Sequence, residues 1–134
     1  MTTTVQLPKS LVEKVVQLAK ATPEQEICGL IGHCDKHYEC YPIDNMAMDT
    51  SVLFALNASE QIAAFKTMQA SGHDFFAIYH SHPHSSAWPS HIDIEAAEYP
   101  EVLNLIVSLN MPDDFEIRGF YLRAKTVEEV ELIL

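Results

Sequence analysis

The sequence predicts a single α/β domain in which a mixed β-sheet is flanked by helices. Apolar stretches typical of buried strands alternate with stretches of helical periodicity, and neither an internal repeat nor a segment of linker composition interrupts them. A length of 134 residues is enough for one domain with its own hydrophobic core. We therefore expect one domain over residues 1–134.

The first part of the chain is predicted to contain one helix followed by three strands. Residues 8–21 carry apolar side chains at helical spacing, and a proline at the start suits a first helical turn. Residues 26–34 are apolar and short, which favours a buried strand that turns back into a second strand over 38–43. After an irregular connection, a short strand is predicted over 52–56.

A second helix is predicted over residues 58–71. Ile62, Phe65 and Met68 are expected to share its buried face, and Gly72 stands where a helix commonly ends. The rest of the chain reads as four strands and one short helix, with a polar loop over 81–89. The predicted strands are 75–80, 102–109, 115–123 and 127–134, and the predicted helix is 90–98.

The charge and the cysteines limit the environment and the partners of the protein. A formal net charge of −11 disfavours nucleic acid and anionic membranes as partners. An odd number of cysteines, three, and an N-terminus without signal-peptide character favour reduced thiols in the cytoplasm. No stretch approaches the ~18 apolar residues that a membrane helix needs. We expect a soluble, cytoplasmic protein with neither nucleic acid nor membrane as partner.

The residues whose side chains could bind a metal or take part in catalysis begin at the end of the predicted strand 75–80. His80 and His82 are two positions apart, and in an extended backbone such residues point to the same face. Two imidazoles that converge leave room for a carboxylate and a water on a zinc ion. A His-x-His pair alone also occurs by chance, so the pair needs a third ligand to carry the interpretation.

Asp93, eleven positions after His82, allows two interpretations. Ser90 is well placed as a helix N-cap, so Ser90-x-x-Asp93 reads as a capping box worth ~1 kcal/mol. Alternatively, Asp93 completes a set of two histidines and one carboxylate around a hydrolytic zinc. The preceding His-Ser-His-Pro sequence favours the ligand.

This combination resembles the metal motif of the JAMM (Jab1/MPN/Mov34) metallopeptidases. His80, His82 and Asp93 match it position for position, and the stretch Glu26 to Gly32 is similar to the strand that carries the family's glutamate. The resemblance covers nearly the whole chain and is closest to the compact, stand-alone prokaryotic members. It implies an MPN/JAMM (cytidine deaminase-like) architecture.

The resemblance also implies a mechanism and a substrate. His80, His82 and Asp93 would bind one Zn²⁺ per chain, Glu26 would be the general base and Ser90 would stabilise the oxyanion. The expected reaction is hydrolysis of an amide at the C-terminal Gly-Gly tail of a ubiquitin-like or sulfur-carrier protein. Exposed strand edges are also compatible with a homodimer.

Two other functions stay open from the sequence. One is a non-catalytic MPN-like module that binds ubiquitin-like proteins, although here every ligand position is filled. The other is a zinc hydrolase of a small-molecule amide. A cytidine deaminase would need a Pro-Cys-x-x-Cys pattern, which the chain lacks.

Several further residues carry weaker expectations. Trp88 and His84, in the loop between His82 and Asp93, are candidates for substrate binding. A second group, Cys34, His37 and Cys40, has metal-binding residue types, but incidental thiols beside a turn are favoured over a second metal site.

Overall fold

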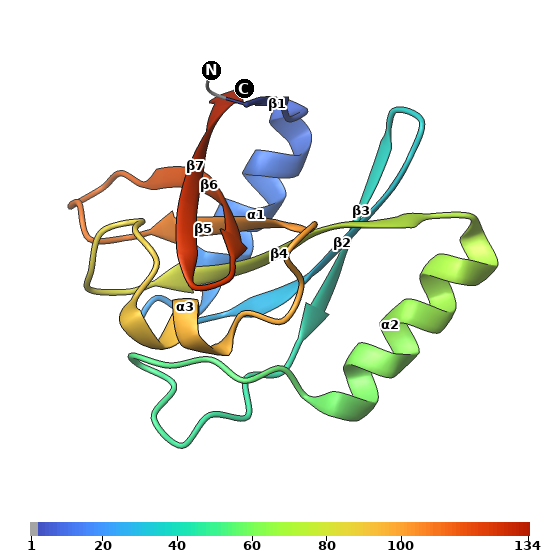
Figure 1. Cartoon of the computed structure of the whole chain (residues 1–134). Helices are drawn as coiled ribbons and strands as arrows, with labels where there is room; N and C mark the ends of the chain where they lie inside the picture. The colour runs from blue at the N-terminus through green and yellow to red at the C-terminus, as the bar shows by residue number, and fades with distance from the viewer. Residues whose placement is uncertain (1–2) are drawn as a thin grey trace.

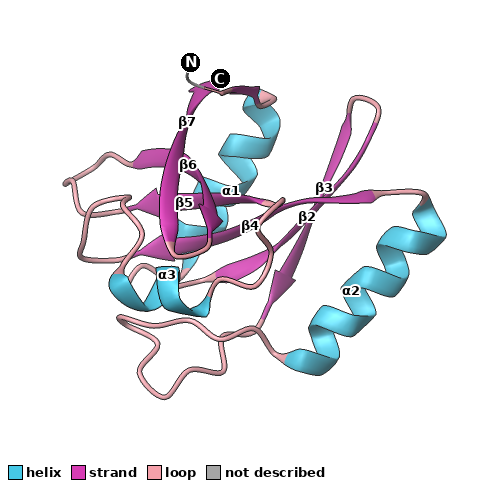
Figure 2. Cartoon of the chain, in the orientation of Figure 1, coloured by secondary structure: helices cyan, strands magenta, loops and turns pink. Residues whose placement is uncertain are grey.

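A seven-stranded mixed β-sheet organises the chain in the computed structural model, which describes residues 3–134 (Figures 1 and 2). The strand order is β1-β7-β6-β5-β4-β2-β3; β4 pairs with β5 and β1 with β7 in parallel, and the other neighbours are antiparallel. The elements in chain order are β1 (Thr4–Gln6), α1 (Lys9–Ala21), β2 (Cys28–Cys34), β3 (His37–Ile43), α2 (Ala58–Ser71), β4 (Asp74–His82), α3 (His91–Ala96), β5 (Leu103–Ser108), β6 (Glu116–Arg123) and β7 (Thr126–Ile133).

Helices cover both faces of the sheet because the central strands are apolar on both sides. On β4, Ala77 and Tyr79 belong to the main core, which α1 covers, whereas Ile78 belongs to a second cluster together with side chains of α2. Neighbouring strand residues point to opposite faces, so the two clusters lie on opposite sides of the sheet. In Figure 1, α2 and α3 lie on the side of the sheet opposite to α1. The mixed sheet flanked by helices is the predicted fold class.

Gly29 marks a close approach between β2 and its neighbours. A Cβ atom there would lie 2.3 Å from the Tyr79 hydroxyl oxygen and 2.6 Å from the Tyr41 carbonyl oxygen. Tyr79 is fully buried, so it cannot move away to make room. A side chain at position 29 would therefore push β2 away from β4.

The prediction of a strand over 52–56 is wrong. This segment is irregular and makes a single bridge, between Asn45 and Leu56. Its backbone groups are bound by a side chain instead: Asn45 Nδ2 donates to the Leu53 carbonyl, and Asn45 Oδ1 accepts from the Ala55 amide. An asparagine thus supplies two of the hydrogen bonds that hold this segment, beside the backbone bond from the Met46 amide to the Ala55 carbonyl at 2.7 Å.

Two predictions about the central elements need smaller corrections. The strand predicted over 75–80 continues to His82, because Ser81 and His82 still pair with Val107 and Ser108 of β5. Ile62 was expected on the buried face of α2, but 56% of it is exposed, whereas Met68 is buried. Six residues rotate a helix by ~240°, so these two side chains lie ~120° apart. Gly72 does end α2, with φ of 71°.

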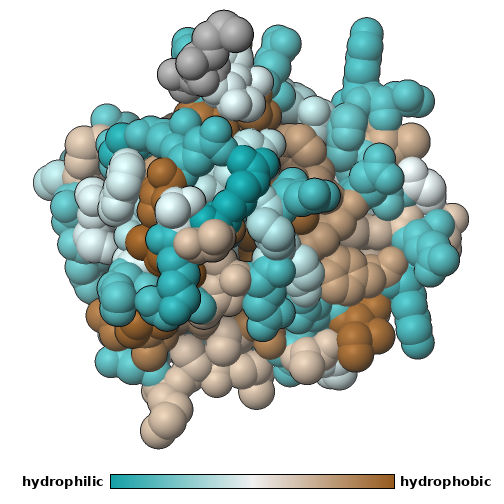
Figure 3. Space-filling model, in the orientation of Figure 1, coloured by the Kyte–Doolittle hydropathy of each residue, from teal (hydrophilic) through white to brown (hydrophobic). Residues whose placement is uncertain are grey.

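Polar side chains cover most of the face seen in Figure 3, with apolar side chains interspersed. Among the helices described, none has the length and apolar character needed to cross a membrane. The short strand β1, which was not predicted, closes one edge of the sheet by pairing with β7.

Candidate metal centre

Three side chains from two elements converge on one point. His80 and His82 stand at the end of β4 and face the same side of the sheet, and Asp93 comes from the first turn of α3. The two Nε2 atoms are 3.1 Å apart, and each lies 3.2 Å from Asp93 Oδ2. All three residues are buried. The structure therefore brings together the three residues that the sequence singled out as ligands.

The spacing of these atoms suits a tetrahedral metal ion. Zinc–ligand distances of ~2.0–2.1 Å place neighbouring tetrahedral ligand atoms ~3.3–3.4 Å apart. The observed triangle of 3.1 to 3.2 Å is only slightly tighter than this. Two neutral nitrogens and one carboxylate oxygen also form a donor set typical of hydrolytic zinc. The residues present thus fit a zinc ion with one position left for a water or a substrate.

Asp93 is both a capping residue and a member of this triangle. Ser90 Oγ accepts a hydrogen bond from the Asp93 amide at 3.0 Å, and the Ser90 amide donates to Asp93 Oδ2 at 2.8 Å. The same Oδ2 atom faces both histidines. The two interpretations of Ser90-x-x-Asp93 are therefore compatible, because the capping box fixes the carboxylate that the ligand set requires.

The electrostatics of His80 and Asp93 favour the protonation states that bind a metal, whereas those of His82 favour its protonated form. Burial lowers the pKa of His80, against the opposing hydrogen bond from Asp93. Burial alone would raise the pKa of Asp93, but hydrogen bonds with His80 and His82 outweigh it and hold this pKa well below its usual range. Burial alone would lower the pKa of His82, but the hydrogen bonds to Asp93 and to the Ser86 carbonyl outweigh burial and raise this pKa. A neutral His80 beside an ionised Asp93 is ready to bind a cation.

Glu26 is the fourth member of the cluster. One atom from each of Glu26, His80, His82 and Asp93 lies within 4.8 Å of the others, and no other such group occurs in residues 3–134. Glu26 is 4% exposed, and its Oε1 atom has no hydrogen-bond partner among the described residues. Burial raises the pKa of Glu26 to about 7, with His82 opposing the rise and Asp93 adding to it. A buried carboxylate of this kind can exchange a proton near neutral pH.

Two residues hold the Glu26 segment in place: Ser81, which the sequence placed in the His-Ser-His-Pro motif without a role of its own, and Asn45, which it did not single out. Ser81 Oγ accepts a hydrogen bond from the Ile27 amide at 2.9 Å, and the Ser81 amide donates to the Ile27 carbonyl. Asn45 Nδ2 donates to the Glu26 carbonyl at 2.9 Å. These contacts join positions far apart in the chain, so no local pattern could have revealed them. They fix Glu26 relative to the strand that carries the histidines.

The candidates for substrate binding, His84 and Trp88, are not members of this cluster. His84 is exposed and pairs with Glu24 at 3.3 Å, and Trp88 packs edge-on against Phe120 at 5.2 Å while 44% of it is exposed. Their role in substrate binding stays a prediction. Phe54, from the irregular segment, stacks on His80 at 4.3 Å between ring centroids, which the sequence did not indicate.

Comparisons with known proteins place these observations in a wider context. A family model described as prokaryotic homologs of the JAB domain matches residues 8–121. A desampylase from Haloferax volcanii is 32% identical over 93 residues, which are 67% of this chain and 67% of that protein. A CysO-cysteine peptidase from Mycobacterium tuberculosis is 27% identical over 128 residues, covering 92% of this chain and 87% of the relative.

Solved structures show the same fold. The solution structure of a protein from Desulfitobacterium hafniense matches with a TM-score of 0.79 and 29% identity, over 98% of this chain and 92% of that one. A JAB1/MPN domain protein from Archaeoglobus fulgidus matches with a TM-score of 0.56 and 16% identity, over 100% of this chain and 98% of that one. The second likeness concerns the fold alone, and it confirms the predicted architecture.

Proposed function

The chain belongs to the family of prokaryotic homologs of the JAB domain and is a hydrolase of the JAMM type, and we propose that it is a zinc-dependent peptidase acting at the Gly-Gly tail of a ubiquitin-like or sulfur-carrier protein. The observation that carries the proposal is the convergence of His80, His82 and Asp93, with atoms 3.1 to 3.2 Å apart. The buried carboxylate of Glu26 lies beside them.

His80 Nε2, His82 Nε2 and Asp93 Oδ2 are the atoms that would hold the zinc. When bound, zinc supplies a Lewis acid that lowers the pKa of a water and polarises the scissile carbonyl. The protein contributes a rigid frame, because β4 fixes both histidines and the capping box fixes Asp93. The Ser86 carbonyl accepts from His82 Nδ1 at 2.7 Å, which orients that ring.

Glu26 is proposed to move the proton that hydrolysis requires. Its Oε1 atom takes a proton from the attacking water and passes it to the nitrogen of the leaving amine as the carbon–nitrogen bond breaks. Burial raises the pKa of Glu26 to about 7 in the metal-free site, which supports a carboxyl group that can both accept and donate a proton. Glu24 is exposed and engaged with His84, so it is a poor alternative.

Ser90 is proposed to assist at the carbonyl oxygen. Its Oγ atom already accepts the Asp93 amide, which leaves the hydroxyl hydrogen free to donate. Negative charge develops on the substrate oxygen as the carbonyl is attacked, and a positioned donor stabilises it. Ser90 would thus act as a helix cap and an oxyanion donor at once.

The substrate is proposed from the family resemblance and from the two relatives. One relative is named a desampylase and the other a CysO-cysteine peptidase, and both names support a protein substrate of the ubiquitin-like or sulfur-carrier kind. Glycines at the tail suit a buried metal site, since they bring no side chain to the reacting carbonyl. The partner would be such a carrier with its tail extended by a residue or a protein.

The test is cleavage of ubiquitin-like carriers extended beyond Gly-Gly by the zinc-loaded protein, followed by mass spectrometry. We expect release of the extension at the Gly-Gly end, and a loss of ~10²–10⁴-fold in kcat for Glu26→Gln. Glu24→Gln is the matched control and should behave as wild type. Small amides serve as competing substrates; their cleavage without any carrier cleavage would favour a small-molecule hydrolase instead.

A further inference from the structure

The loop that follows β4 is held at three consecutive residues by side chains of three neighbouring strands. Each bond comes from a different strand and reaches a different loop residue: Ser108 Oγ on β5 donates to the Ser85 carbonyl at 2.5 Å, His82 Nδ1 on β4 donates to the Ser86 carbonyl at 2.7 Å, and Glu116 Oε1 on β6 accepts from the Ala87 amide at 3.1 Å. In Figure 1 this loop lies beside the ends of β5 and β6. The Ser86 carbonyl, which meets the proposed ligand His82, thus has an anchored residue on either side.

The register of the sheet places the three side chains in one row. His82 pairs with Ser108 across β4 and β5, and Ser108 pairs with Glu116 across β5 and β6. Paired residues on neighbouring strands point to the same face of a sheet, and neighbouring strands lie ~4.7–4.9 Å apart. The row therefore presents three polar side chains to one short stretch of loop.

The two outer anchors are well fixed. Ser108 is 2% exposed, and its Oγ atom also accepts from the Asn110 amide at 3.1 Å, so its one hydrogen is directed at the Ser85 carbonyl. Ala87 is fully buried in a cluster with side chains of β5 and β6. Ser86 lies between these anchors and is itself exposed. The anchors are therefore what keeps the Ser86 carbonyl turned toward β4 rather than toward water.

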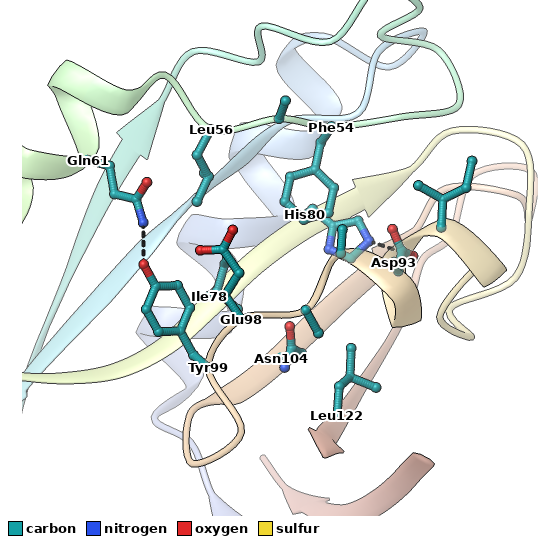
Figure 4. Close-up of a pocket in the computed structure, with 14 residues that line it drawn as sticks. Phe54, Leu56, Gln61, Ile78, His80, Asp93, Glu98, Tyr99, Asn104 and Leu122 are labelled. Atoms are coloured by element: carbon teal, nitrogen blue, oxygen red, sulfur yellow. Dashed lines mark hydrogen bonds and ion pairs between the residues drawn. The ribbon is translucent and has the colours of Figure 1, made fainter. Parts of the chain in front are cut away.

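The two histidines of the metal centre are held in different ways. Phe54 stacks on the His80 ring with 4.3 Å between centroids, and Asp93 faces the Nε2 atom of His80 (Figure 4). His80 Nδ1 has no hydrogen-bond partner among residues 3–134. His82 Nδ1 is bonded to the loop, so the orientation of this ring depends on where the Ser86 carbonyl lies.

We propose that Ser108 and Glu116 are positioning residues of the metal centre, which hold the Ser86 carbonyl so that His82 Nε2 faces the other two ligands. The inference rests on the proposed zinc site, because it takes His82 Nε2 to be a ligand. A histidine that binds a metal donates its second N–H to an acceptor that fixes the ring, and loss of such support weakens metal binding ~10–100-fold. Here the acceptor is a loop carbonyl, which needs support of its own.

The experiment measures zinc affinity by competition with a chelator of known affinity. Ser108→Ala and Glu116→Ala should each bind zinc ~10–100-fold more weakly than wild type. Glu116→Gln keeps an oxygen that accepts from the Ala87 amide, so it should bind zinc nearly as tightly as wild type. A loss in Glu116→Gln equal to that in Glu116→Ala would mean that the charge of Glu116, and not its hydrogen bond, acts on the cation, and it would overturn the positioning role.

Two control variants separate positioning from general effects. Glu131→Ala removes an exposed carboxylate of β7, so it changes the net charge by the same amount as Glu116→Ala. Asn57→Ala removes the cap of α2 and no bond to the loop, so it destabilises the fold elsewhere. Both controls should keep the wild-type zinc affinity. A loss in either control as large as that in Ser108→Ala would overturn the proposal.

Hydrogen exchange of the Ala87 amide gives a readout that needs neither zinc nor activity. Because Glu116 accepts from this amide, it should exchange about tenfold faster in metal-free Glu116→Ala than in metal-free wild type. Glu116→Gln should exchange about as slowly as wild type. Equal exchange in wild type and Glu116→Ala would show that the bond does not hold the loop in solution, and it would overturn the proposal.

The outcomes separate this inference from the proposed function. If wild type binds one zinc and both alanine variants bind it as tightly, Ser108 and Glu116 do not position His82, while the proposed zinc site stands. If metal-replete wild type binds no zinc, both proposals fall together.

Discussion

Two parts of the chain are rich in metal-binding residue types, and only one of them becomes a metal centre. At the end of β4, His80 and His82 meet Asp93 with atoms 3.1 to 3.2 Å apart. At the hairpin of β2 and β3, Cys34 and His37 face each other across the strands, and Cys40 follows on β3. Within residues 3–134 this second set does not form a cluster of ligand atoms.

The difference follows from spacing along a strand. Residues two apart, such as His80 and His82, point to the same face, whereas residues three apart point to opposite faces. Cys40 accordingly packs against the core under α1, while His37 lies near His73 on the other face, with ring centroids 5.4 Å apart. A helix with a capping box then brings the third ligand to the histidine pair. Metal-binding residue types form a site only when their side chains point to the same face of the sheet.

The largest expected effect is on metal content, which tests directly which of the two regions binds the metal. His82→Ala removes one corner of the triangle, so zinc should fall from about one per chain to nearly none after dialysis. His37→Ala removes a histidine of the other region and should keep the wild-type zinc content. Elemental analysis of the three proteins at equal concentration provides the measurement.

Two results would contradict this comparison. Retention of a full zinc by His82→Ala would mean that the ion is bound elsewhere. Loss of zinc in His37→Ala, with the fold intact by circular dichroism, would assign the metal to the hairpin region.

A smaller effect is expected at Ser90, and it compares two helix caps. Ser90 Oγ caps α3, and Asn57 Oδ1 caps α2 by accepting the Glu60 amide at 3.0 Å. Alanine at either position should lower the free energy of unfolding by ~1 kcal/mol. If Ser90 also donates to the oxyanion, only Ser90→Ala should lose ~10²-fold or more in kcat.

Urea unfolding and steady-state kinetics on the two variants check this prediction. Equal stability losses with full activity in both proteins would reduce Ser90 to a cap. Loss of activity in Asn57→Ala would show that destabilisation alone explains the effect at Ser90.

The sequence reveals the metal ligands more easily than the contacts that hold the site in place. His80, His82 and Asp93 are close in the chain, so spacing and residue type were enough to predict that they converge. Ser81, Asn45 and Phe54 act through contacts that the local sequence does not specify, such as the bond between the Ile27 amide and Ser81 Oγ. The failed strand over 52–56 has the same origin, because an asparagine side chain supplies hydrogen bonds that hold this segment.

The smallest expected effect is a pH dependence that belongs to the hairpin region. Burial raises the pKa of the Cys40 thiol to about 11, with Lys14 opposing the rise and Glu39 adding to it. Because the folded pKa exceeds the value of ~8.5 in an unfolded chain, the thiol stabilises the fold fully below pH ~8.5, and this contribution is lost between pH ~8.5 and ~11. The limit for one group is ~1.4 kcal/mol per pH unit, and solvent screening at this partly buried thiol should keep the loss well below that limit.

Cys40→Ser removes the titrating thiol and should flatten the fall of the unfolding free energy from pH 8.5 to 10.5, once the difference at pH 7 is subtracted. Urea unfolding at each pH measures it. Identical slopes in both proteins would mean that the thiol ionises in the folded state as readily as in the unfolded chain. A flatter slope would show that Cys40 acts as a partly buried apolar side chain packed against the core, which is how a hairpin with metal-binding residue types can lack a metal site.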